Sequence, residues 1–148
     1  EVYRVRPDVN AVCRFHGKFA LVMSVMSGLK RTLRPVHELA LALGREIQVF
    51  DSPELISSPE LGHRLARTLG AAKGVLLRGN GQVAVGGSVE EAVVNAIMLE
   101  ASAEVQWRAL AIGEPAWIDG DEFTRLAKRD YEWVQRPWAY YLARAKSR

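Results

Sequence analysis

The chain has 148 residues, of which 49% are hydrophobic and 25% charged, a composition that suits one globular domain with a hydrophobic core. The net charge is only +3 and is spread along the chain, which argues against nucleic acid as the partner. The longest apolar stretch, Phe19 to Met26, is too short to span a bilayer, and we see no signal-peptide pattern. We therefore expect a cytoplasmic protein that does not bind membranes.

The first part of the chain predicts strands and helices of moderate length. Ser58 followed by Pro59 is typical of the start of a helix. Hydrophobic spacing and turn residues give the expected elements in chain order: a strand at Val9–Phe15, helices at Lys18–Met26 and Val36–Leu43, a strand at Glu46–Phe50, and the helix that Ser58 begins.

A β-hairpin is the next expected element. Its strands are Val75–Arg78 and Gln82–Val85, which are mostly aliphatic or β-branched. Asn80 and Gly81 lie between them, and an Asn-Gly pair tolerates the positive φ angles of a two-residue hairpin turn. The sequence therefore predicts a tight turn at Asn80-Gly81.

A long helix follows the hairpin and has clear signals at both ends. Ser88 and Glu91 form a capping box, in which the Ser88 hydroxyl accepts from the N–H of Glu91 and the Glu91 carboxylate accepts from the N–H of Ser88. Gly113 and then Pro115 end the helix. The apolar positions at helical spacing are Ala92, Val93, Ala96, Leu99, Ala103, Trp107 and Leu110.

The last segment is predicted to be helical and contains a cluster of aromatic residues. A polar turn at Asp119–Asp121 opens it, and it ends in Arg136-Pro137-Trp138-Ala139-Tyr140-Tyr141. Amphipathic aromatic residues dominate interfaces, so they are expected to pack the tail onto the body or onto a neighbouring subunit. The alternative is that they line a substrate pocket.

Two motifs resemble the class II aldolase/adducin family. Leu77-Arg78-Gly79-Asn80-Gly81, with the strand, glycine and Ser-x-Glu-Glu-Ala helix that follow, is similar to the family's Leu-Arg-Gly-His-Gly signature. The segment Tyr3–Val12 resembles the family's Tyr-x-x-Arg-Pro-Asp-Val-Asn-Ala-Val. The resemblance implies an α/β fold with three α/β/α layers and a central, mostly antiparallel sheet. Residues 1–148 would form one domain, the C-terminal portion of a class II aldolase-like domain whose first part, with an anion-binding loop and a catalytic acid, precedes Glu1.

The resemblance also implies a metal site, and this chain departs from it. In the family the strand ends in His-x-His, and a third histidine lies in the hairpin; the matching positions here are Arg14, His16 and Asn80. A divalent metal prefers imidazoles or carboxylates, whereas an arginine is a permanent cation that should repel it. We therefore expect no cofactor; the alternative is a divalent metal such as Zn, Mn or Fe, with His16 as the ligand.

Strand alternation places Arg14 and His16 on one face of the sheet, two residues apart. The Arg14 guanidinium would then occupy the volume of the metal's coordination shell, which suggests a metal-free site. Arg14 would bind a carboxylate or phosphate, His16 would act as acid or base, and Asn80 would orient a substrate oxygen. Two alternatives remain open: Arg14 pairs with an Asp or Glu in a site that has lost its chemistry, and Asn80 serves only the turn. His37, in a Pro-containing connection, is a further pocket candidate, whereas His63 suits a half-exposed helix position.

The function expected from the resemblance is a lyase-like activity, either decarboxylation or aldol-type C–C chemistry, on a small carboxylate-bearing substrate. The Arg-Pro-Trp-x-Tyr-Tyr run looks like tails of the decarboxylase-like and oxygenase-like branch, which implies an aromatic substrate and makes Tyr140 a candidate binding residue. Family members assemble as ring-like tetramers, so a homo-oligomer or a second chain that supplies the missing half is expected. The alternative is a catalytically silent subunit or scaffold, like the adducin heads.

Overall fold

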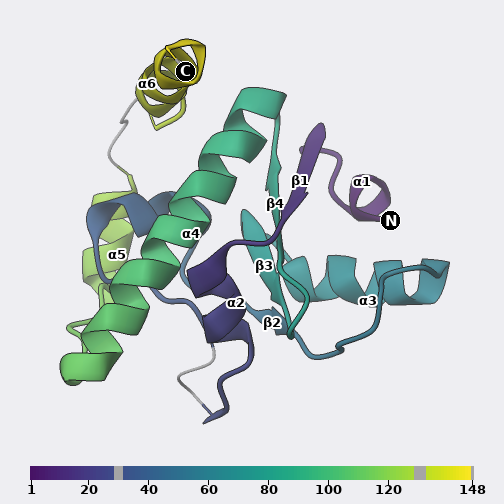
Figure 1. Cartoon of the computed structure of the whole chain (residues 1–148), viewed down its shortest axis with the longest axis horizontal. Coiled ribbons are helices and arrows are strands. Elements are labelled where there is room, and N and C mark those ends of the chain that lie inside the picture. Colours follow the sequence, from purple (N-terminus) through teal and green to yellow (C-terminus); the bar gives the residue numbers. More distant parts are fainter. Residues whose placement is uncertain (29–31, 129–132, 148) are drawn as a thin grey trace.

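The computed structural model describes residues 1–28, 32–128 and 133–147 (Figure 1). Strands and helices are interspersed up to β4, and helices follow in the rest of the described chain. The elements are α1 (Val2–Val5), β1 (Ala11–Phe15), α2 (Lys18–Ser24), the 3-10 helix η2 (Glu38–Leu43), β2 (Val49–Phe50), α3 (Pro59–Leu69), β3 (Gly74–Leu77), β4 (Gln82–Gly86), α4 (Val89–Ile112), α5 (Gly120–Ala127) and α6 (Gln135–Lys146).

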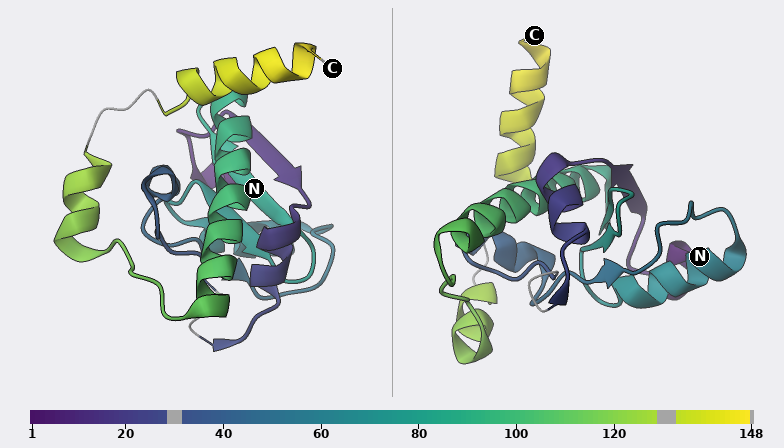
Figure 2. Two further views of the ribbon diagram at one scale, coloured as in Figure 1. Left: turned by 60° about the vertical axis from the view of Figure 1, so that its left-hand side comes forward. Right: turned by 60° about the horizontal axis from the view of Figure 1, so that its bottom comes forward.

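The strands form one mixed sheet in the order β1-β4-β3-β2. The β1–β4 and β3–β4 pairs are antiparallel, and only the β2–β3 pair is parallel. Helices α2 and α4 cover one face and α3 covers the other (Figures 1 and 2). The prediction of a three-layer α/β fold with a mostly antiparallel sheet is therefore confirmed.

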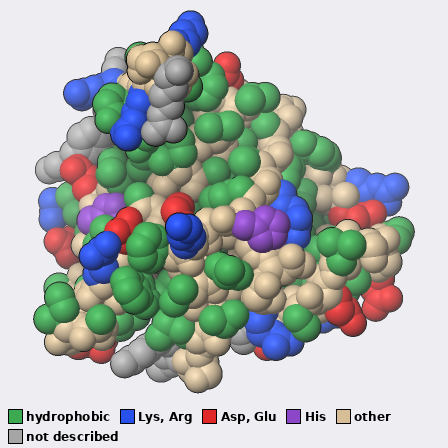
Figure 3. Space-filling view, viewed as in Figure 1, with side chains coloured by type: hydrophobic (Ala, Val, Ile, Leu, Met, Phe, Trp, Pro, Cys, Tyr) green, Lys and Arg blue, Asp and Glu red, His purple; other side chains and the backbone are tan. Residues whose placement is uncertain are grey.

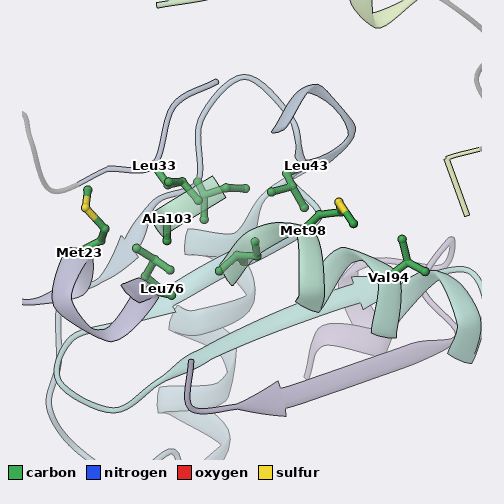
Figure 4. Packing of buried hydrophobic residues seen from close by; sticks show 10 residues of the cluster. Met23, Leu33, Leu43, Leu76, Val94, Met98 and Ala103 are labelled. Atoms are coloured by element: carbon green, nitrogen blue, oxygen red, sulfur yellow. The ribbon is translucent and has the colours of Figure 1, made fainter. Parts of the chain in front are cut away.

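Alternate residues of β3 separate two hydrophobic clusters, one on each face of the sheet. Leu76 joins the cluster beneath α4, whereas Val75 and Leu77 face α3. The α4 cluster, shown in Figure 4, consists of Ala20, Met23, Leu33, Leu43, Ile47, Leu76, Val94, Met98, Leu99 and Ala103. Because β3 and β4 are covered on both faces, all of their residues are buried, and the hairpin is a rigid support for what it carries.

Helix α4 holds the rest of the chain through buried polar side chains. Asn95 donates to the Val85 carbonyl at 2.8 Å. Gln106 accepts from the Arg34 N–H at 2.7 Å and donates to the Thr32 carbonyl at 2.8 Å. Buried polar groups stabilise a fold only when they are paired, so these bonds fix the connection after α2 in one position along α4.

The predicted capping box is half correct. The Ser88 hydroxyl accepts from the Glu91 N–H at 3.2 Å, as expected. The Glu91 carboxylate, however, accepts from the Gly87 N–H at 2.7 Å and pairs with Lys73 at 2.9 Å. Lys73 immediately precedes β3, and its ammonium draws the carboxylate toward the strand. Helix α4 ends at Ile112 with Gly113 as its cap, as predicted.

Several predicted boundaries of strands and helices are wrong. The strand predicted at Val9–Phe15 begins only at Ala11, and the helix predicted at Lys18–Met26 ends at Ser24. The helix predicted at Val36–Leu43 is a 3-10 helix that starts at Glu38. The strand predicted at Glu46–Phe50 is reduced to β2, because Ile47 bridges to Leu33 instead of joining the β3 ladder.

The C-terminal helices lie at the edge of the molecule (Figure 2). Val134, Trp138 and Tyr141 pack against the α4 cluster, so the aromatic tail does pack onto the body. Tyr140 keeps 59% of its surface exposed. None of the helices in the described part of the chain is both long and apolar enough to cross a membrane.

Candidate functional site

The structure brings together Arg14 and Asn80, two of the residues that the sequence predicted to share a site. Arg14 lies near the end of β1, opposite Val83 of β4, and Asn80 lies in the loop that precedes β4. The Arg14 Nη2 donates to the Asn80 side-chain oxygen at 3.0 Å and approaches the Asn80 carbonyl at 3.4 Å. The antiparallel β1–β4 register makes this contact, because it places the end of β1 beside the start of β4.

The turn that carries Asn80 differs from the prediction. Strand β3 ends at Leu77 and β4 starts at Gln82, so the connection has four residues instead of the two-residue Asn-Gly turn. Gly79 and Gly81 have φ angles of 67° and 83°, and no described residue other than glycine has a positive φ. The turn preference of Asn-Gly therefore does not explain why an asparagine occupies position 80.

The tip of the hairpin is fixed from two sides. On one side, the fully buried Ser24 of α2 accepts from the Gly79 N–H at 3.1 Å. On the other, Arg78 pairs with Asp51 at 2.6 Å. The Asn80 amide also lies 3.5 Å from the Glu54 carbonyl. Asn80 is thus held between Arg14 and the loop after β2, which orients its side chain.

His16 follows β1 and lies against the same hairpin. A Cβ atom on Gly81 would come within 2.9 Å of the His16 ring, so only a glycine lets the imidazole approach this closely. Arg14 and His16 are both exposed, whereas Cys13 and Phe15 between and beside them are half-buried. This alternation agrees with the expected placement of Arg14 and His16 on one face of the sheet.

The guanidinium of Arg14 has no carboxylate partner within residues 1–28, 32–128 and 133–147. Its contacts are to neutral oxygens of Asn80. An ion-paired arginine would have its charge neutralised by the protein, but this one presents its charge to solvent. The arrangement therefore leaves a cation, an amide and an imidazole on one surface.

Among the described residues, His37 hydrogen-bonds to α4 and not to the hairpin that carries Asn80. Its Nε2 is 3.2 Å from the hydroxyl of Ser102, a fully buried residue of α4. Burial lowers the pKa of the His37 imidazole, which favours the neutral ring. No described interaction joins His37 to Arg14, His16 or Asn80, so its predicted place in the pocket stays a prediction. His63 lies on α3 with half of its side chain exposed, as expected.

Tyr140 stacks edge-to-face on Tyr141, with 5.1 Å between the ring centroids. It borders a hollow of about 510 Å³ between α6, α4 and η2, which Met98, Leu39 and Arg136 also line. Arg14, His16 and Asn80 are not among the residues that line this hollow. Substrate binding by Tyr140 therefore also stays a prediction.

The donor set fits a metal ion poorly. His16 is the one imidazole among the three matching positions, and Asn80 already gives its side-chain oxygen to Arg14. Among the described residues, no group of three or more His, Cys, Asp and Glu could hold a metal ion. Divalent metals in tight sites require several neutral or anionic donors, and a guanidinium offers none.

Sequence reasoning missed two residues that approach Gly17, the residue after His16. Glu100 of α4 accepts hydrogen bonds from the start of α2, and Gln82 of β4 is completely buried beneath the same turn. One signal was present in the sequence: Gln82 is polar, whereas the residues that follow it in β4, Val83, Ala84 and Val85, are aliphatic. No local pattern marks Glu100, because its partners are about 80 residues away in the sequence.

Comparison with solved structures defines the class of fold. An aldolase II superfamily protein from Pseudomonas syringae superposes with a TM-score of 0.79 over 99% of this chain and 60% of its own, at 20% identity. An L-fuculose 1-phosphate aldolase superposes with a TM-score of 0.77 over 85% of this chain and 57% of its own, at 23% identity. The fold is therefore that of a class II aldolase.

Sequence comparison then gives the family. Residues 1–107 match the family described as Class II Aldolase and Adducin N-terminal domain, and the chain belongs to that family. The prediction of this family from the sequence motifs is confirmed.

Two curated relatives have names that state an activity. The chain is 28% identical to the 5-methylthioribulose-1-phosphate/5-deoxyribulose-1-phosphate aldolase of Rhodospirillum rubrum, over 87% of this chain and 57% of the relative. It is 32% identical to Decarboxylase NovR of Streptomyces niveus, over 87% of this chain and 47% of the relative. A third relative, human gamma-adducin, is 31% identical over 74% of this chain and 15% of its own length. The chain thus spans about half the length of the first two.

Proposed function

We propose that this chain carries the substrate-anchoring part of a lyase-type site, in which Arg14 stands in place of a metal ligand and binds a small carboxylate-bearing substrate. The observation that carries the proposal is the exposed guanidinium, whose contacts within the described chain are neutral oxygens of Asn80. A planar guanidinium can hold a carboxylate or phosphate through two parallel N–H bonds. Asn80 fixes one edge of the fork and leaves the rest for an anion.

The relatives support C–C bond chemistry, because one is named as an aldolase and another as a decarboxylase. In both reaction types the electron pair of the broken C–C bond moves onto an adjacent carbonyl group, whose oxygen becomes an enolate. A fixed cation near that oxygen stabilises the developing charge. As the alternative to holding the substrate carboxylate, Arg14 would supply this charge, and the Asn80 amide would orient the oxygen.

In an aldol cleavage a proton leaves the substrate hydroxyl as the C–C bond breaks, and in both reactions a proton must then reach the carbon of the enolate. An imidazole can donate or accept a proton, and His16 is exposed on the same side of the sheet as Arg14. We therefore assign proton transfer to His16. Tyr140 and His37 remain candidates for contact with the distal part of the substrate, where an aromatic ring would favour Tyr140.

Arg14→Lys tests this proposal, because it retains the positive charge and loses the bidentate geometry. We expect the affinity for pyruvate or inorganic phosphate, measured by isothermal titration calorimetry, to fall by about 1.5–3 kcal/mol. The melting temperature should hardly change, since Arg14 is exposed. Arg4→Lys is the matched control, because the Arg4 side chain is 79% exposed and pairs loosely with Glu1 at 3.4 Å. Unchanged affinity in Arg14→Lys would contradict the proposal.

The second candidate is a catalytically silent subunit or scaffold in a homo-oligomer, such as a tetramer, or in a complex with a second chain. Two observations favour it: His16 is the one imidazole at the three matching positions, and hydrophobic side chains are spread over the face that α4 crosses (Figure 3). Exposed members on α4 include Val105, Trp107 and Ile112. Exposed apolar patches are typical of association surfaces. A lowered melting temperature in Arg14→Lys, without any effect on ligand binding, would favour this candidate.

A further inference from the structure

The turn between β1 and α2 carries His16, and Glu100 of α4 binds the residues that follow this turn. The Glu100 carboxylate accepts from the Phe19 N–H at 2.9 Å and from the Ala20 N–H at 3.0 Å. These are free N–H groups in the first turn of α2, whose own cap, Gly17, has no side chain. A carboxylate at a helix N-terminus also interacts favourably with the helix dipole. The start of α2, directly after His16, is therefore tied to α4 in addition to its local bond from the Leu21 N–H to the Gly17 carbonyl.

Gly17 shows how closely this turn approaches the layer below. Its backbone is extended, with φ −74° and ψ 140°, so any residue could adopt its conformation. A Cβ atom at this position would nevertheless collide with the Glu100 carboxylate and with the side-chain amide of Gln82. Glycine is thus required by space, because Glu100 and Gln82 both reach the backbone of the His16 turn.

Gln82 is the unexplained member of this group. It pairs with Phe15 across the β1–β4 ladder, has no exposed surface, and neither its side-chain oxygen nor its nitrogen has a partner among the described residues. An unpaired buried amide destabilises a fold, whereas a leucine or valine would suit this aliphatic strand. A Cβ atom on the neighbouring Gly81 would come within 2.9 Å of the His16 ring, so Gly81 lies next to His16 and Gln82 lies next to Gly17.

From these contacts we propose that Gln82 and Glu100 are positioning residues for His16. Glu100 fixes the start of α2, and the buried amide of Gln82 supports Gly17 from the other side, so that the imidazole rests on Gly81 on the same side as Arg14. Gln82 is fully buried and the Glu100 carboxylate is bonded to backbone N–H groups of α2, so both would act on the site through the His16 turn. This inference rests on the proposed function only in that it takes His16 to be part of the site.

The test separates positioning from stability. The chain has three histidines, so a ¹H–¹³C correlation spectrum of the imidazole groups contains three signals, and His16→Asn assigns the one from His16. In Gln82→Leu we expect the melting temperature to rise, because an unpaired amide is replaced by an apolar side chain, while the His16 signal shifts or splits. In Glu100→Gln, which keeps the size of the side chain and loses its charge, we expect the His16 signal to shift in the same way.

Gln106→Leu is the matched control. Gln106 is also a buried polar residue of α4 that holds a distant loop, and it lies about 9 Å along the helix axis from Glu100. We expect this variant to lower the melting temperature and to leave the His16 signal in place. If the His16 signal moves no more in Gln82→Leu and Glu100→Gln than in Gln106→Leu, whatever the melting temperatures, the two residues are structural and the inference is overturned.

A second readout connects the inference to ligand binding. If the wild-type chain binds inorganic phosphate through Arg14, we expect Gln82→Leu and Glu100→Gln to change that affinity by less than about twofold, because the two residues position His16 and leave the contacts of Arg14 with Asn80 in place. Absence of phosphate binding by the wild-type chain would count against the proposed function. The His16 signal would still decide the positioning role, so the two failures can be told apart.

Discussion

Two arginines at opposite ends of β1 differ in how fully the protein satisfies their charge. Arg6, which precedes β1, donates to both carboxylate oxygens of Asp8 at 2.7 and 2.8 Å and also reaches the carbonyls of Gly70 and Ala72. Arg14, near the other end, contacts only neutral oxygens of Asn80 within the described chain. Arg6 shows what a structural arginine looks like in this fold, and Arg14 lacks its carboxylate and its burial. The comparison favours a ligand, rather than the fold, as the partner of Arg14.

Two substitutions would convert the surroundings of Arg14 into the metal site that the family resemblance implies. Arg14→His combined with Asn80→His would put imidazoles at all three positions that match the family's metal ligands, and the side chains at positions 14 and 80 already lie within hydrogen-bond distance of each other. Three neutral imidazoles are a common donor set for zinc. We expect the affinity for Zn²⁺ to rise by at least about a hundredfold over the wild-type chain, a gain that rests on the added donors.

Dialysis followed by elemental analysis measures the bound zinc. Val12→His in the wild-type background is the control, because Val12 lies on the same face of β1 but pairs with Val85, farther from the hairpin tip. The wild-type chain should retain substoichiometric metal. Stoichiometric zinc in the wild-type chain would mean that Arg14 does not prevent metal binding. The conclusion that Arg14 stands in place of a metal ligand would then be wrong.

The Arg6 end should dominate stability. The Arg6 side chain is only 13% exposed, and its removal leaves two backbone carbonyls without their donor. We expect Arg6→Ala to lower the free energy of unfolding by about 2 kcal/mol, as for other hydrogen bonds to charged groups. Arg14→Ala should change it by less than about 0.5 kcal/mol. Urea unfolding of both variants measures the difference, and equal losses would show that Arg14 is also a structural residue.

The Arg6 end should also respond to acid. The hydrogen bond from Arg6 holds the pKa of the Asp8 carboxyl well below its usual value, at about 2. Because the folded-state pKa is depressed, the stabilising contribution is fully present above the unfolded value of about 3.9 and is lost as the pH falls through about 2. Asp8→Asn should therefore lose less stability than the wild type between these pH values, as followed by thermal melting. Salt should weaken the effect, since Asp8 is exposed.

The smallest effect on stability is expected at Asn80. Since no positive φ is required there, Asn80→Ala should change the free energy of unfolding by less than about 0.5 kcal/mol. Gly81→Ala, at φ 83° and in contact with the Phe15 carbonyl, should cost about 1–3 kcal/mol by comparison. A large loss in Asn80→Ala would restore the interpretation of Asn80 as a turn residue and remove it from the site.

Much of the fold follows from local patterns in the sequence. The aliphatic strands around the hairpin, the Ser58 and Ser88 caps and the Gly113 stop are properties of short segments, and the structure contains each of them. The family motifs likewise placed Arg14, His16 and Asn80 at one end of the sheet. Backbone propensity and capping act over a few residues, so a sequence without its tertiary structure can reveal them.

Tertiary contacts decided what those patterns left open. Lys73 redirected the Glu91 carboxylate away from the predicted capping box, and the bridge between Leu33 and Ile47 shortened the predicted strand before β2. Contacts between segments far apart in the sequence also determined that Arg14 meets an amide and not a carboxylate, and that Glu100 caps α2. Such contacts depend on strand register and on the packing of α4 over the sheet, and these are properties of the whole fold that no local stretch of sequence encodes.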